Sequence, residues 1–167
     1  MAQTPKTYNQ PKVLKSQSQA LEFATFYIGE ALCGIDILLV QEINRQIEVT
    51  CIPKAPDYVI GVLNLRGKIV TVIDLGKKLG LSPIRVSKYN RNIIVNSQDE
   101  HIGLVVDRIS DVIITDSSKI EPAPSNIGGL RGKYFKGVYK TDRSLIGILN
   151  IENVLKEDSS NPVNIAT

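Results

Sequence analysis

His101, Cys33 and Cys51 are the residues with the greatest potential for metal binding or nucleophilic chemistry in this chain, which has one histidine and two cysteines. A structural zinc site needs four closely spaced ligands, and His101 beside Glu100 cannot complete one with so few cysteines. The cysteines stand 18 residues apart, outside any CxxC pattern. Nothing else in the sequence suggests secretion, so we predict reduced thiols that act as small core residues.

Two other motifs also fall short of catalytic chemistry. The segment GGLRGK (128–133) has the glycines of a phosphate-binding loop but not the GxxxxGK[ST] spacing or the helix that should follow. Asp107 and Asp111, four residues apart among apolar residues, are more typical of turn capping than of acid–base catalysis. We therefore predict no catalytic residue, no cofactor and no metal site, and we expect that the protein is not an enzyme.

The most unusual local feature is an arginine between two apolar runs, in GVLNLRGKIVTVIDL (61–75). Each run predicts a β-strand, and Arg66-Gly67 between them predicts a two-residue hairpin turn. Such turns prefer Asn-Gly or Asp-Gly, because both central residues need a positive φ. Because arginine is not a preferred residue in such a turn, we expect Arg66 to have a functional role.

Composition limits the classes of function. The 167 residues are 43% hydrophobic and 22% charged, with a net charge of +3, as in a globular protein of one ordinary domain or of two very small ones that share a core. A nucleic-acid-binding barrel stays open as an alternative, but three Phe, six Tyr and no Trp offer little base stacking, and no basic stripe is present. No segment approaches the roughly 20 apolar residues of a membrane span, and no signal peptide opens the chain, so we expect a cytoplasmic protein without direct membrane insertion.

The sequence contains an internal repeat. With a shift of 69 residues, apolar and glycine positions of the first half match the second; after the Pro-rich segment the shift becomes 76. The matched pairs include Phe26/Val95, Gly34/Gly103, Val40/Ile109, Ile43/Val112, Tyr58/Tyr134, Gly61/Gly137 and Leu79/Leu155. Shared positions are expected to serve the fold, and positions that differ are candidates for function. Arg66 differs, because its counterpart is Asp142.

Short Val- and Ile-rich runs bounded by Gly, Pro, Asn and Asp predict a mainly β protein. The predicted strands are Glu22–Ile28, Leu32–Asp36, Gly61–Leu65, Lys68–Asp74, Arg91–Asn96, His101–Val106, Lys136–Tyr139 and Leu145–Asn150, with brief helical turns at Ile37–Glu42, Gly76–Leu79 and Ile151–Lys156. The Gly-rich segment at 125–133 is predicted to form a loop. We expect disordered tails at 1–20 and 157–167, and two small β-barrels at 21–86 and 87–156 that pack as one domain and could exchange a strand.

Three segments together resemble the CheW family of chemotaxis coupling proteins: FATFYIGEALCGIDILLVQEI (23–43), IPKAPDYVIGVLNLRGKIVTVIDL (52–75) and IGLVVDRISDV (102–112). The resemblance covers about Glu22 to Lys156. It implies two five-stranded SH3-like barrels around a pseudo-twofold, in agreement with the duplication. The regulatory domain of the histidine kinase CheA shares this fold and is the nearest rival. The chain departs from common CheW proteins at Cys33, Thr71 and Gly76, where an aromatic residue, Pro and Arg are frequent.

The resemblance also implies a function: an adaptor that couples the cytoplasmic tips of chemoreceptors (methyl-accepting chemotaxis proteins) to the CheA regulatory domain, in membrane-associated arrays. Other CheW-like proteins in rings are further implied partners. A CheW-like coupling protein of a pilus-motility array is an open alternative. The receptor-binding positions implied by the family are Ile35, Val40, Glu42, Gly61, Arg66, Val105 and Val112. Because the family places Glu42 and Arg66 near the same groove, we also predict that these two side chains pair.

Overall fold

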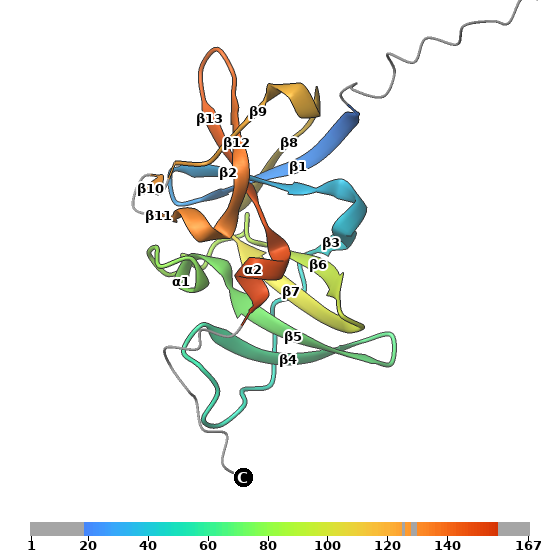
Figure 1. The fold of residues 1–167 in the computed structure, drawn as a ribbon. Coiled ribbons are helices and arrows are strands. Elements are labelled where there is room, and N and C mark those ends of the chain that lie inside the picture. Colours follow the sequence, from blue (N-terminus) through green and yellow to red (C-terminus); the bar gives the residue numbers. More distant parts are fainter. Residues whose placement is uncertain (1–18, 125, 128–129, 157–167) are drawn as a thin grey trace, which may run out of the picture.

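Figure 1 shows the fold in a computed structural model, which describes residues 19–124, 126–127 and 130–156. The predicted tails therefore lie outside the described residues, except for Gln19 and Ala20. Ala20 already begins the first strand, and the Gln19 amide donates to Ser117 Oγ at 3.2 Å. The expected N-terminal tail is thus two residues too long, because its end is held by backbone and side-chain hydrogen bonds.

The upper half of Figure 1 is a six-stranded sheet with the strand order β8-β1-β2-β13-β12-β9. All neighbours in it are antiparallel except β2 and β13, which run parallel. Its strands are β1 (Ala20–Ile28), β2 (Ala31–Asp36), β8 (Arg108–Asp116), β9 (Ile120–Glu121), β12 (Phe135–Lys140) and β13 (Leu145–Leu149).

The lower half of Figure 1 is a five-stranded sheet with the order β3-β6-β7-β5-β4. Its strands are β3 (Val40–Asn44), β4 (Val59–Leu65), β5 (Lys68–Asp74), β6 (Arg91–Ser97) and β7 (Glu100–Val106). The remaining elements are short: helices α1 (Leu75–Lys78) and α2 (Ile151–Leu155), 3-10 turns η2 (Ile37–Leu39), η3 (Ser117–Lys119) and η4 (Gly132–Tyr134), and the ribbon β10 (Asn126–Ile127) with β11 (Leu130–Arg131). The segment predicted as a loop at 125–133 thus contains a small ribbon.

The internal repeat appears in the structure as matched strand register. Phe26 lies opposite Cys33 in one sheet, and their repeat counterparts Val95 and Ile102 lie opposite each other in the other sheet. The parallel pairs match as well, Gly147 with Cys33 and Thr71 with Ile102. This agreement supports the pseudo-twofold expected between the two halves.

The sheets do not follow the expected division at residues 86 and 87. Residues 40–106 supply the whole five-stranded sheet, whereas residues 20–36 and 108–149 together form the six-stranded one. Each half of the repeat therefore gives its first two strands, β1–β2 or β6–β7, to the sheet of the other half. The sequence predicted that a single strand could be exchanged between the halves. The structure shows instead that each half exchanges a hairpin with the other, so the two halves form one domain.

The mainly β prediction is confirmed, but the expectation of closed five-stranded barrels is not. Each sheet keeps two edge strands, with no backbone ladder joining them among the described residues. The six-stranded sheet also exceeds the expected strand number, because the two-residue β9 pairs with β12.

The largest hydrophobic cluster lies between the two sheets. It contains Phe26 and Ile35 from one sheet together with Val95 and Leu104 from the other, all fully buried. Because strand side chains alternate, Ile94 points to the opposite face and joins a smaller cluster within the five-stranded sheet. A third cluster lies within the six-stranded sheet. Most of the core therefore depends on both halves being present.

Gly61 and Gly137 show why the repeat shares a glycine. Each follows a bulge in its strand, β4 or β12, where a neighbouring segment crosses closely. A Cβ atom on Gly61 would lie within 3.0 Å of the Thr50 carbonyl oxygen, and one on Gly137 equally near that of Glu121. Real Cβ atoms essentially never approach backbone so closely, so both positions need glycine for packing.

Candidate functional site

The β4–β5 hairpin ends in the two-residue turn Arg66-Gly67. Both residues have positive φ angles, 50° and 81°, as a type I′ turn requires. Asn64 Oδ1 accepts a hydrogen bond from the Gly67 amide at 2.9 Å and holds the turn closed. A left-handed conformation is unfavourable for arginine, and such strain is common where a side chain has a functional role.

The predicted pair between Arg66 and Glu42 is confirmed. Arg66 Nη1 donates to Glu42 Oε2 at 2.5 Å. Glu42 lies on β3 and Arg66 at the tip of β4–β5, so the pair joins the two opposite edges of the five-stranded sheet. The ion pair bridges the sheet edges at a place where no backbone ladder does.

Asn44 holds the other oxygen of the same carboxylate. Its Nδ2 donates to Glu42 Oε1 at 2.8 Å, while its own Oδ1 accepts from the Gln46 amide at 2.9 Å. The hydrogen bonds from Arg66 and, next, from Asn44 lower the pKa of the Glu42 carboxyl below its ordinary value. Glu42 is therefore ionised at neutral pH, and it orients an arginine whose side chain remains 73% exposed.

The other half of the molecule lacks the chemistry of this pair. The repeat counterparts of Glu42 and Arg66 are Asp111 and Asp142, two acids of the same charge. The β12–β13 tip is closed instead by a backbone bond from Thr141 to Ser144 at 2.8 Å and by Thr141 Oγ1. The guanidinium is thus a local specialisation and not a requirement of the fold.

Three of the seven predicted receptor-binding residues are buried. Ile35 is 0% exposed in the core between the sheets, and Val105 is 2% exposed in the cluster within the five-stranded sheet. Gly61 is buried beneath the Thr50 backbone. The structure thus gives these three residues a place in the packing of the sheets, and the receptor contact implied for them stays a prediction.

The remaining two predicted positions differ in accessibility. Val40, half-buried on β3, packs against the core between the sheets. Val112 lies on β8, an edge of the other sheet, and is 54% exposed. The structure thus brings together Glu42 and Arg66, leaves Val112 on the six-stranded sheet and Val40 half-buried on β3, and buries Ile35, Gly61 and Val105.

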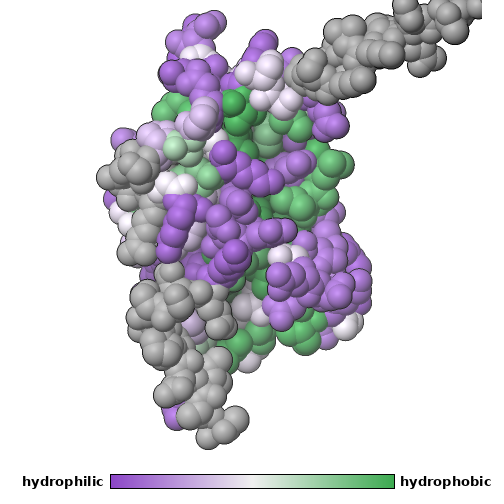
Figure 2. All heavy atoms as spheres, in the orientation of Figure 1, coloured by the Kyte–Doolittle hydropathy of each residue, from purple (hydrophilic) through white to green (hydrophobic). Residues whose placement is uncertain are grey.

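Exposed apolar residues also lie near the site, and of the three described here only Val112 is among the predicted receptor-binding positions. Ile43 and Val112 are repeat counterparts on the two edge strands β3 and β8, and both are exposed; Leu38 in η2 is 88% exposed. Figure 2 shows hydrophobic side chains at the surface over the segment that joins β2 to β3 in Figure 1. Exposed apolar residues of this kind commonly mark protein-binding surfaces. The matched apolar identity of Ile43 and Val112 was a usable signal. Asn44 was also missed, because β3 was not predicted as a strand and nothing else placed Asn44 beside the Glu42 side chain.

The arrangement can bind an acidic or carbonyl group, because an arginine offers a planar fork of donors. No group of His, Cys, Asp and Glu side chains within the described ranges could hold a metal ion. Likewise, no helix in the part of the chain that the structure describes is long and apolar enough to cross a membrane.

The comparisons with known proteins agree with this picture. The CheW-like domain family matches residues 22–159. The CheW chemotaxis proteins of Helicobacter pylori and Klebsiella aerogenes are 33% and 34% identical to this chain, over 86% and 87% of it and 87% of each relative. A solved structure, described as the scaffolding protein TtCheW from Thermoanaerobacter tengcongensis, has a TM-score of 0.77 and 34% identity, covering 84% of this chain and 90% of that one.

These matches extend over nearly all of the described residues, so they include both sheets and the Arg66 hairpin. They confirm the resemblance inferred from the three sequence segments. CheW proteins are chemotaxis scaffolds and adaptors, which confirms the prediction that the protein is not an enzyme. The chain belongs to the CheW family.

Proposed function

We propose that this protein is an adaptor that couples chemoreceptor cytoplasmic tips to the regulatory domain of the histidine kinase CheA. It would work in the cytoplasm, within membrane-associated receptor arrays, with other CheW-like proteins as further ring partners. Family membership supports the general role. The observation that carries the site assignment is the Glu42–Arg66 pair at a strained hairpin tip, present in one half of a duplicated fold and replaced by two acids in the other.

In this proposal Arg66 contacts the receptor, and Glu42 with Asn44 holds the guanidinium in place. Glu42 occupies only one edge of the arginine through Nη1, and most of the side chain is exposed. A receptor carboxylate or carbonyl can therefore bind the same fork without displacing Glu42. Val112 would add apolar contact, whereas Ile35, Val40, Gly61 and Val105 would maintain the shape of the surface.

An adaptor of this kind transmits a signal only if it binds its partners with different affinities in the kinase-on and kinase-off states. Individual contacts can be weak, because an array holds many of them at high effective concentration. A single exposed arginine contact is compatible with such a system.

Co-sedimentation with a receptor cytoplasmic fragment and CheA, combined with a kinase assay, tests the proposal. We expect the wild-type protein to raise kinase activity above its receptor-free level. Arg66→Ala should weaken co-sedimentation with the receptor fragment about tenfold, as loss of one charged hydrogen-bonded contact predicts. Arg143→Ala, which removes an exposed arginine from the other hairpin tip, is the matched control and should bind normally.

Two results would contradict the proposal. Kinase activity that stays at the receptor-free level with the wild-type protein would exclude the coupling role. Equal binding by Arg66→Ala and Arg143→Ala would exclude Arg66 as the receptor contact while leaving the coupling role standing.

A further inference from the structure

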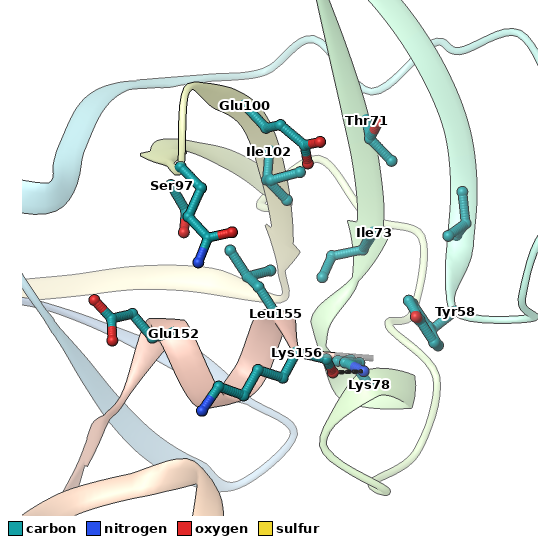
Figure 3. A pocket seen from close by; sticks show the side chains of 12 residues that line it. Tyr58, Thr71, Ile73, Lys78, Ser97, Glu100, Ile102, Glu152, Leu155 and Lys156 are labelled. Atoms are coloured by element: carbon teal, nitrogen blue, oxygen red, sulfur yellow. Dashed lines mark hydrogen bonds between the residues drawn. The ribbon is translucent and has the colours of Figure 1, made fainter. Parts of the chain in front are cut away.

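Asn92 on β6 is a fully buried polar side chain that the receptor contact proposed above does not include. It is 0% exposed and lies on the same face of the five-stranded sheet as Ile94 and Val105, which belong to the smaller hydrophobic cluster. The pocket beside α2 in Figure 3 lies on the other face of this sheet, where Ile73 and Ile102 point. Asn92 therefore serves neither that pocket nor the core between the sheets.

Asn92 and Asn44 together bind both backbone groups of Gln46. The two asparagines lie directly opposite each other on the neighbouring strands β6 and β3. Asn44 Oδ1 accepts a hydrogen bond from the Gln46 amide at 2.9 Å, and Asn92 Nδ2 donates to the Gln46 carbonyl at 3.0 Å. Because the β3–β6 ladder ends at this pair of residues, side-chain hydrogen bonds fix the point at which the chain leaves the sheet.

Beyond Gln46 the chain crosses the face of the sheet on which Asn92 lies. Ile47 and Val49 pack against the smaller hydrophobic cluster, and Thr50 exchanges backbone hydrogen bonds with Val62 on β4. The crossing segment is thus held at one end by backbone hydrogen bonds and at the other by the two asparagines.

The other half of the molecule shows that the fold does not require the asparagines. Their repeat counterparts are Phe23 and Ile113, which lie opposite each other in the same register on β1 and β8. Both are apolar and belong to the cluster within the six-stranded sheet. The β1–β8 ladder continues beyond Ile113 to Asp116, so the backbone itself holds the residues that follow. The two asparagines occur only in the half that carries Glu42 and Arg66.

Asn92 is also an unfavourable residue for this position. Its Oδ1 is buried and accepts no hydrogen bond from the described residues, and a buried amide oxygen without a partner lowers stability. The side chain fits because Gly103 lies beside it, where a Cβ atom would come within 3.0 Å of both Oδ1 and Nδ2. Departures from an apolar core are expected where a residue serves function, and the group that Asn92 uses here is its donor to Gln46.

The Asn44 amide connects Gln46 to the exposed ion pair. With its Oδ1 directed at the Gln46 amide, its Nδ2 points to Glu42 Oε1 at 2.8 Å. Glu42 Oε2 in turn accepts from Arg66. If Gln46 were released, the Asn44 amide could rotate away and the Glu42 carboxylate would lose one of its two hydrogen bonds.

We propose that Asn92 is a positioning residue for the receptor contact: it holds the Gln46 peptide in place and thereby orients the side chains that set the direction of the Arg66 guanidinium. The inference rests on the proposed function for the receptor contact itself. The positioning of the ion pair is testable without a receptor.

The first test measures the pKa of the Glu42 carboxyl by NMR titration with no partner present. The hydrogen bond from Asn44 lowers this pKa, so it should be higher in Asn92→Ala than in the wild-type protein. Asn92→Leu fills the space without a donor, should give the same result, and carries the test if Asn92→Ala folds poorly. Val70→Ala removes buried apolar volume from the same cluster and is the control, with the wild-type Glu42 pKa.

A double variant shows whether Asn92 acts through Asn44. The Glu42 pKa in Asn92→Ala/Asn44→Ala should equal that in Asn44→Ala alone, because the path from Asn92 to the carboxylate is then already broken. A wild-type Glu42 pKa in both Asn92 variants, or a further rise in the double variant, would overturn the proposal.

The second test measures affinity for the receptor fragment at a temperature where all variants are folded. Asn92→Ala should lose about fivefold, as the loss of one neutral hydrogen bond predicts, and so less than Arg66→Ala. In the Arg66→Ala background the same change should have no further effect. Val70→Ala should bind like the wild-type protein.

The results separate this inference from the adaptor function. If the wild-type protein does not bind the receptor fragment, the proposed receptor contact fails, and the Glu42 titration still decides whether Asn92 positions the ion pair. If the wild-type protein binds and both Asn92 variants bind equally well, Asn92 does not position the receptor contact.

Discussion

Replacement of Gly61 by alanine distinguishes a structural from a direct functional role at a position that the family resemblance assigns to receptor binding. The added methyl group would lie 2.4 Å from the Thr50 carbonyl oxygen, 2.8 Å from Val49 Cγ2 and 2.9 Å from the Thr50 carbonyl carbon. Backbone atoms cannot yield as a flexible side chain can, so the segment around Thr50 must move away from β4. Overpacking of this kind costs about 2 to 3 kcal/mol.

The loss should be visible in thermal unfolding. At about 4 °C per kcal/mol for a domain of this size, the midpoint of Gly61→Ala should fall by about 8 to 12 °C. Gly137→Ala provides the matched control, because its methyl group would meet the Glu121 carbonyl in the same way on the other sheet. We expect similar midpoint losses for both variants.

Receptor binding completes the experiment. At a temperature where both variants are folded, Gly61→Ala should weaken receptor co-sedimentation because displacement of the Thr50 segment disturbs the sheet that carries Arg66. Gly137→Ala should weaken it less. The reasoning is refuted if Gly61→Ala leaves the unfolding midpoint unchanged and nevertheless abolishes binding, since the glycine would then act by direct contact.

Three further predictions concern ionisable side chains. Because Arg66 lowers the pKa of Glu42, the ionised carboxylate stabilises the folded protein at pH values above its ordinary pKa of about 4.3. The difference in unfolding free energy between wild type and Glu42→Gln should therefore shrink as the pH falls through the lowered pKa. A difference that grows on acidification would contradict this. Asn44→Ala should raise the Glu42 pKa toward its ordinary value in a carboxyl NMR titration, whereas an unchanged pKa would show that Asn44 has no part in the pair. Burial raises the pKa of the Cys33 thiol to about 12, so a thiol reagent should modify only Cys51 in the native protein and both in denaturant; rapid native labelling of Cys33 would contradict its burial.

The strands of the interior were predictable because their apolar residues are contiguous and bounded by turn residues. β6 and β7, for example, are within one residue of the predicted ranges. The edge strands β3 and β8 were missed as strands, since residues such as Glu42 and Asp111 interrupt their apolar pattern. An edge strand is half solvated, and its sequence shows correspondingly less periodicity. The expectation that Cys51 lies in the core was wrong for a related reason, because an isolated small apolar residue carries no signal of burial.

The duplication, the hairpin tip at Arg66 and the pairing of Arg66 with Glu42 were all available from the sequence, because they depend on local patterns and on a family resemblance. The tertiary structure alone decided which half supplies which strand. It also decided that Ile35, Gly61 and Val105 are buried.

Hairpin exchange cannot be inferred from the repeat, since the same apolar strands can pair within a half or between halves with similar local energetics. The shared core between the sheets selects the exchanged arrangement, because long-range contacts between β1, β2, β6 and β7 bury Phe26, Ile35, Val95 and Leu104 together. The sequence thus determined the repeated strands and the turns between them. The packing of the two halves against each other determined which of their side chains remain available to a partner.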